Sequence, residues 1–338
     1  AAVSAVNARK TGFFMGMPPP VPTIHQPGNQ FGWDRLLSVL KTLVTLRSGK
    51  MVGTDQPMVG KICLVTGATA GIGEATASGL AALGATVVVA GRSIERCVAA
   101  VERIKQQTGN QNVDHLLADL SSLKQVRSLA DEFKSRHSRL DVLVNNAGAI
   151  NLVRRETVDG IELTFALNHL SYFLLTNLLL DLLSSSAPAR IVNVSSSSHR
   201  KARINFDDLQ GHRGYRGMRA YGQSKLGNVL FTYELARRLE GTGVTANALH
   251  PGVVATRFLA NNGKIGPIFS FFFGLRGISP ENGARTSVYL ASSDETEGIT
   301  GGYYEKSQAV RSVPASYDED AAARLWEISV EMTAEHSS

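Results

Sequence analysis

The sequence is poor in cysteine, with only Cys63 and Cys97 among its 338 residues. Two cysteines are too few for a disulfide scaffold or a four-cysteine zinc site, and we interpret both as small core residues. Glycine is plentiful, but the 32 glycines follow no G-X-Y period, which excludes a collagen-like fibre. Four histidines lie scattered without metal-ligand spacing, so no metal site is expected: His169, His199, His212 and His250.

Acidic residues are almost absent from the first 50 positions, which hold six bases and only Asp34. This segment accounts for most of the net charge of +6, because the remaining chain holds 29 bases and 28 acids. The charge forms no basic stripe with interleaved aromatic residues, so we expect no nucleic-acid partner. Hydrophobic residues make up 43% of the chain and charged residues 19%, which is typical of a globular protein rather than a disordered one.

Residues 1–58 are interpreted as an N-terminal extension. Five prolines between positions 18 and 27 favour an extended tail over residues 1–30. Residues 31–47 have apolar side chains at helical spacing and predict an amphipathic helix, too short in its apolar part for the ~20 residues of a membrane span. The low acidity resembles an organellar targeting region, of chloroplast or mitochondrion. The alternatives are the cytosol or the surface of the endoplasmic reticulum, with the helix on a membrane surface or on the protein's own body.

From position 61 the pattern changes to short apolar runs rich in Val, Ile and Leu. They lie at 61–67, 86–91, 140–148, 189–196 and 243–252. Such runs predict strands buried on both faces of a sheet, and helical stretches such as 74–83 and 122–136 alternate with them. We therefore expect one Rossmann-type α/β domain over residues 59–338, with a doubly wound parallel sheet and helices on both faces.

A glycine-rich turn, Thr66–Gly73, follows the first expected strand and begins the first expected helix. Gly67 permits a tight turn, Gly71 lets backbone N–H groups approach a pyrophosphate, and Gly73 lets the helix pack close to the sheet. The positive end of the helix dipole favours the phosphate charge. The turn therefore predicts a dinucleotide site.

The end of the second strand indicates which dinucleotide is bound. No acidic residue is present there to bind a ribose 2′-hydroxyl, whereas Arg92 suits a 2′-phosphate, so NADP(H) is favoured over NAD(H). Arg92 as a solvated surface residue is the alternative. Asp119, after Leu116 and Leu117, ends the third strand and can accept a hydrogen bond from the adenine amino group.

Polar residues also follow the later strands and predict a catalytic cluster. Tyr221 and Lys225 are four positions apart and share a helix face, and Ser196 ends the fifth strand. Because the carboxyl ends of parallel strands meet at one edge, these side chains should converge. A nearby lysine ammonium group, together with a cationic nicotinamide, should lower the pKa of the Tyr221 phenol toward use in acid–base catalysis. Asn168 lies in a long apolar helix nearby in the sequence.

These motifs together resemble the short-chain dehydrogenase/reductase family over residues 59–310. TGATAGIG, NNAG, the Asn168 helix, VSS, YGQSK and PGVVAT all occur in family order. The resemblance implies that Tyr221 transfers the proton, Lys225 lowers its pKa and holds the nicotinamide ribose, Ser196 orients the substrate oxygen and Asn168 anchors a relay water. It also implies cofactor contacts from Gly67, Thr69, Ala70, Gly71, Ile72, Gly73, Arg92, Asp119, Leu120, Asn146, Ala147, Gly148, Tyr221, Lys225, Pro251, Gly252, Val254 and Thr256.

Within that family the sequence is similar to the retinol dehydrogenase subgroup, and also to the WW-domain oxidoreductase and a chloroplast-envelope short-chain dehydrogenase. The implied activity is NADP(H)-dependent interconversion of a carbonyl and an alcohol. Phe269–Phe273 lies where this family places its substrate lid and indicates an apolar substrate, such as a retinoid-like or lipid aldehyde. Alternatively, Phe269–Phe273 and the helix at 31–47 attach the protein to a membrane or a protein complex. A homodimer is a further possible assembly. A nucleotide-binding structural or regulatory subunit of a larger complex is the alternative function.

Overall fold

The computed structural model describes residues 56–252 and 278–334. Several sequence-based expectations lie outside these residues. They are the extended tail, the helix at 31–47, Val254, Thr256 and the apolar segment Phe269–Phe273.

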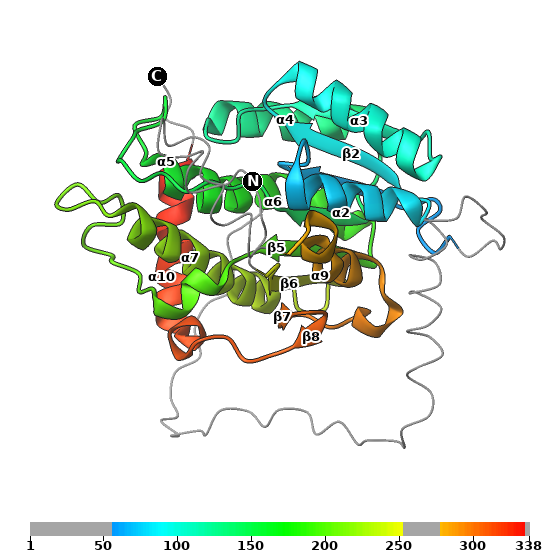
Figure 1. Ribbon diagram of the computed structural model, residues 1–338. Coiled ribbons are helices and arrows are strands. Elements are labelled where there is room, and N and C mark those ends of the chain that lie inside the picture. The colour runs from blue at the N-terminus through cyan, green and yellow to red at the C-terminus, as the bar shows by residue number, and fades with distance from the viewer. Residues whose placement is uncertain (1–55, 253–277, 335–338) are drawn as a thin grey trace, which may run out of the picture. The chain divides into compact units, whose positions relative to one another are not determined.

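An eight-stranded sheet forms the centre of the described chain, with the order β3-β2-β1-β4-β5-β6-β7-β8 (Figure 1). The strands are β1 Ile62–Thr66, β2 Thr86–Gly91, β3 Val113–Leu117, β4 Val142–Asn145, β5 Ala189–Val194, β6 Val244–His250, β7 Tyr303–Glu305 and β8 Gln308–Ala309. All neighbours pair in parallel except β7 and β8. The order of the first six strands is that of a doubly wound dinucleotide-binding sheet, so the expected fold class is confirmed.

Five strands form where the apolar runs predicted them, namely β1, β2, β4, β5 and β6. Alternate side chains of these strands are buried on opposite faces of the sheet. In β1, Leu64 belongs to one hydrophobic cluster, whereas Cys63 and Val65 belong to another. Cys63 is fully buried, as is Cys97, in agreement with their interpretation as core residues. The sheet therefore separates two apolar layers, and its central strands are shielded from water on both sides.

Helices cover both faces of the sheet. Residues of α2 and α9 pack against each other and lie side by side in Figure 1, α3 packs on α2, and α4 packs on α6. The bounds are α2 Gly71–Ala82, α3 Ile94–Thr108, α4 Leu123–Arg136, α5 Leu163–Phe165, α6 Ser171–Ser185, α7 Gly217–Arg238, α9 Pro280–Ser292 and α10 Glu319–Thr333. The helix that holds Tyr221, α7, begins one turn before it, at Gly217.

The most apolar helical stretch runs from Leu163 to Ser185 and includes a π-helical turn, Ala166–Leu170. Within the described chain it is the one stretch of 23 residues whose length and mean hydropathy, 1.3, match those of a membrane span. However, 72% of its most apolar 18-residue window is buried in the protein, and Leu174, Leu175 and Leu179 belong to the hydrophobic core. Its hydrophobicity is that of a core helix.

Candidate active site

The glycine-rich turn joins β1 to α2 at the carboxyl edge of the sheet. Gly67 and Gly71 have φ values of 64° and 60°, which favour glycine. A Cβ at Gly73 would lie 2.4 Å from both the Gly67 carbonyl oxygen and the Asn146 amide nitrogen, so only glycine fits there. The first turn of α2 has no side-chain cap, and its N–H groups suit the pyrophosphate of a dinucleotide.

The turn is held against the end of β4 by Thr66 and Asn146. The Thr66 hydroxyl accepts hydrogen bonds from the amides of Asn146 and Ala147, at 2.9 and 3.1 Å. The Asn146 side chain in turn donates to the Thr66 carbonyl at 2.8 Å. Sequence reasoning assigned no role to Thr66, although a hydroxyl residue before the first glycine was a usable signal. These bonds fix the nucleotide turn and Gly148 relative to each other.

Arg92 directly follows β2, and its side chain is exposed. Within the described chain it forms no hydrogen bond or ion pair, so it is available to an anionic ligand. Asp119 follows β3, and one of its carboxylate oxygens accepts hydrogen bonds from the Ser121 amide and hydroxyl, at 3.0 and 2.7 Å. Both residues lie at the ends of the strands where the sequence placed them.

Tyr221 and Ser196 meet at the carboxyl edge of β5. The Tyr221 side chain is 7% exposed and is hydrogen-bonded to Ser196. The Ser196 hydroxyl also accepts a hydrogen bond from the Ser198 amide at 3.2 Å, which fixes its position beyond the strand. The expected convergence of a helix tyrosine and a strand-end serine is therefore present.

Lys225 is buried one turn along α7 from Tyr221, and its Nζ donates to the Val194 carbonyl at 2.9 Å. Asn168 is fully buried; its Nδ2 donates to the Ala149 carbonyl and the Ser224 hydroxyl, both at 3.0 Å. A Cβ at Gly148 would lie 3.2 Å from Asn168 Oδ1 and 3.5 Å from Lys225 Nζ. A side chain at 148 would therefore crowd both polar groups.

The protein's own groups raise the pKa of Tyr221 rather than lower it. Burial raises the pKa of Tyr221 to about 12, against the opposing effect of its hydrogen bond to Ser196. Burial also lowers the pKa of Lys225 to about 7, because its ammonium group has no carboxylate partner among the described residues. The protein by itself therefore keeps the phenol protonated at neutral pH, which is the form that donates a proton to a carbonyl oxygen.

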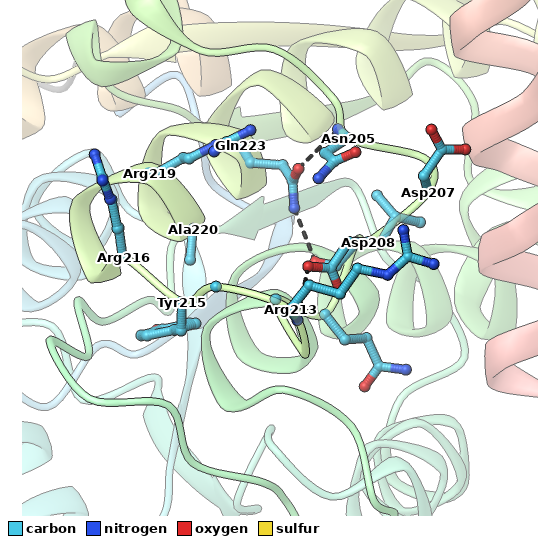
Figure 2. A pocket seen from close by; sticks show the side chains of 13 residues that line it. Asn205, Asp207, Asp208, Arg213, Tyr215, Arg216, Arg219, Ala220 and Gln223 are labelled. Carbon is cyan, nitrogen blue, oxygen red and sulfur yellow. Dashed lines mark hydrogen bonds between the residues drawn. The ribbon is translucent and has the colours of Figure 1, made fainter.

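A separate cavity of about 340 Å³ lies beside the first two turns of α7. Figure 2 shows Gln223 pointing from this helix toward residues 205–210, where it accepts a hydrogen bond from the Asn205 amide and donates to the Leu209 carbonyl. Ala220 and Gln223 occupy a different face of α7 from Tyr221 and Lys225. The cavity is therefore not the space in which the catalytic side chains meet.

The remaining predicted cofactor residues border the same edge of the sheet or lie outside the described residues. Thr69, Ala70 and Ile72 belong to the glycine-rich turn, and Leu120 follows Asp119. Pro251 and Gly252 follow β6, where Gly252 has a φ of 89°. Val254 and Thr256 lie outside the described residues. The structure describes no group of three or more metal-ligating side chains in residues 56–252 and 278–334.

The fold and the site define a nicotinamide-dependent oxidoreductase of the doubly wound α/β class. The sequence model of the short chain dehydrogenase family matches residues 61–264. Human retinol dehydrogenase 13 is 44% identical over 294 residues, which cover 85% of this chain and 88% of that protein. Human retinol dehydrogenase 14 is 44% identical over 288 residues, covering 80% and 86%. The protein belongs to the short-chain dehydrogenase/reductase family and is similar to its retinol dehydrogenases.

Solved structures agree with this membership. An uncharacterised protein from Mycobacterium paratuberculosis superposes with a TM-score of 0.67 at 35% identity, covering 81% of this chain and 94% of that one. The RhlG/NADP active-site complex from Pseudomonas aeruginosa has a TM-score of 0.59 at 30% identity, covering 75% and 96%.

Proposed function

We propose that the protein is an NADP(H)-dependent enzyme that interconverts a carbonyl and an alcohol on an apolar substrate, such as a retinoid-like or lipid aldehyde. The observation that supports it most is the set of Ser196 and the buried Tyr221, Lys225 and Asn168 at the carboxyl edge of the sheet. The similarity to retinol dehydrogenases supports the apolar substrate class. The Phe269–Phe273 sequence, outside the described residues, is consistent with it.

The described residues fit a dinucleotide, since the turn at 67–73 is so tight that only glycine fits at 73, and the α2 N-terminus has no side-chain cap. The turn at 67–73 would hold the pyrophosphate, Arg92 the 2′-phosphate, and Lys225 the nicotinamide ribose. When bound, the nicotinamide supplies or accepts the hydride. In the reductive direction Tyr221 donates its proton to the substrate oxygen while the Ser196 hydroxyl orients that oxygen, and Asn168 holds the water that resupplies the proton.

Activity should depend on the apolar size of the aldehyde. In assays that follow NADPH oxidation, we expect kcat/KM for retinal or a long-chain aldehyde to exceed that for a short aldehyde at least 10-fold. Burial of one further large apolar group contributes roughly 1.5–3 kcal/mol, which corresponds to this ratio. Background rates across the panel, together with intact NADPH binding, would instead favour the alternative of a nucleotide-binding structural or regulatory subunit.

The NADP(H) preference is expected to depend on Arg92. Arg92→Ala should reduce the NADPH-over-NADH affinity ratio roughly 5- to 150-fold, which corresponds to about 1–3 kcal/mol, because one charge-assisted pair with the 2′-phosphate is lost. NADH affinity should change little. Titration calorimetry with both dinucleotides gives the ratio, and Arg96→Ala, an exposed arginine nearby on α3, is the control. Equal affinities of the unaltered protein for the two dinucleotides would reject the assignment.

We also propose a peripheral membrane location in an organelle, chloroplast or mitochondrion. The basic, acid-poor segment 1–50 and the amphipathic pattern at 31–47 support it. The segment 31–47 and Phe269–Phe273 are the proposed contacts with the membrane or with a protein complex. A homodimer is compatible with either contact.

A further inference from the structure

The peptide group between Ser196 and Ser197 lies just beyond the last hydrogen bond of the β5–β6 ladder. That last bond runs from the Ser195 amide to the Leu249 carbonyl at 2.8 Å. Beyond it the chain leaves the sheet, so no neighbouring strand holds the peptide group that follows the proposed catalytic serine. Its position must be fixed by other groups.

Two histidines bind the two polar ends of this peptide group. His199 Nδ1 lies 2.5 Å from the Ser196 carbonyl oxygen, which also accepts a hydrogen bond from the His199 backbone amide at 3.1 Å. The Ser197 amide lies 3.2 Å from His250 Nδ1. The carbonyl oxygen and the amide hydrogen of one trans peptide point in opposite directions, so the imidazoles approach from opposite sides. One comes from the turn after Ser196, and the other from the end of β6.

The partners determine which ring nitrogen carries the proton. A carbonyl oxygen can only accept, so His199 must carry its proton on Nδ1. A backbone amide can only donate, so His250 Nδ1 must be unprotonated, with the proton on Nε2. A second proton on His199 would enter at Nε2 and leave its contact intact. A second proton on His250 would enter at Nδ1 and abolish its contact.

The surroundings hold both rings neutral. His199 is fully buried and packs on the Tyr303 ring at 4.9 Å, and its Nε2 has no hydrogen-bond partner among the described residues. Burial lowers the pKa of His250; Arg200 and His199 lower it further, whereas Glu305, its register partner on β7, raises it. Glu305 is itself bound to Arg200, which limits this effect.

We infer that His199 and His250 are positioning residues that clamp the Ser196–Ser197 peptide group and so orient the Ser196 hydroxyl toward Tyr221. The clamp also links the Ser196 turn to Pro251 and Gly252, which directly follow His250. Because only His250 loses its contact on protonation, its titration should produce an acidic decline in turnover. This inference rests on the proposed carbonyl–alcohol activity.

The kinetic test uses two substitutions of His250 and the aldehyde panel described above. His250→Asn places an amide oxygen near the position of Nδ1 and does not titrate, so kcat at pH 8 should stay within about 3-fold. Its decline between pH 8 and pH 5 should be clearly smaller than that of the unaltered protein. His250→Leu removes the acceptor and should lower kcat about 10-fold or more at every pH. His115→Asn, on β3 at the opposite edge of the sheet, should keep the unaltered profile.

An unchanged acidic decline in His250→Asn, or an unaltered kcat in a folded His250→Leu protein, would overturn the clamp. If the leucine variant does not fold, the asparagine profile decides alone. Histidine ¹⁵N NMR gives a readout that needs no turnover. It should show His199 protonated on Nδ1 and His250 on Nε2 at pH 8, and the reverse at either residue would overturn the clamp. An inactive protein with the expected tautomers would contradict the proposed function and leave the clamp supported.

Discussion

Replacement of Tyr221 with phenylalanine is expected to reduce turnover by about 10²–10⁴-fold, the usual loss for a positioned acid–base group. The change removes one hydroxyl group and keeps the ring, whose side chain is only 7% exposed. The phenol has a pKa raised to about 12 by burial, so its removal takes away the group that is protonated and within reach of Ser196. Steady-state kinetics with NADPH and a reducible aldehyde measure the effect.

Binding of the dinucleotide should survive in the same variant, because the glycine-rich turn and Arg92 are unaffected. Tyr289→Phe, on α9, is a matched control, since it also removes one phenol hydroxyl, which donates to Glu295 at 3.0 Å. That variant should retain full turnover. Turnover close to normal in Tyr221→Phe would exclude Tyr221 as the proton donor.

The sequence predicted those parts of the fold that depend on local pattern. The runs over β1, β2, β4, β5 and β6 are apolar on both faces, which identifies central strands without knowledge of their neighbours. The edges were harder to predict. In β3 only Leu116 and Leu117 were recognised, because an edge strand includes exposed residues such as Asp114. The short β7 and β8 depend on pairing and were not predicted.

The candidate site shows the same division. The spacing of Tyr221 and Lys225 on one helix, and their convergence with Ser196, follow from helix geometry and strand order. The direction in which the pKa of Tyr221 shifts does not follow from the spacing, since it depends on how deeply the phenol is buried. The role of the two histidines could not be predicted from the sequence either. His199 and His250 are distant in the sequence, and only the folded structure brings both to the same peptide group.

The buried ammonium group of Lys225 is expected to destabilise the folded protein. Its side chain is 2% exposed, its Nζ donates only to the Val194 carbonyl among the described residues, and burial lowers its pKa from 10.5 to about 7. In the unfolded chain the group keeps its ordinary pKa. Below pH 7 it is charged in both states, and the cost of burying the charge is present in full. Between about pH 7 and 10.5 the unfolded state binds more protons, so stability rises with pH.

Lys225→Met is therefore expected to be inactive and yet more stable. At pH 7 the free energy of unfolding should rise by about 1–4 kcal/mol, since each pKa unit corresponds to about 1.4 kcal/mol and the lost hydrogen bond offsets about 1 kcal/mol. The Val194 carbonyl keeps a donor, because Asn228 Nδ2 lies 3.4 Å away. Urea unfolding without added dinucleotide, at several pH values, measures the difference in free energy of unfolding between the variant and the unaltered protein. This difference should shrink as the pH rises from 7 toward 10. Lys134→Met, an exposed lysine on α4, should show no comparable difference. A Lys225→Met protein that is less stable than the unaltered one at pH 7 would mean that the buried ammonium group stabilises the fold.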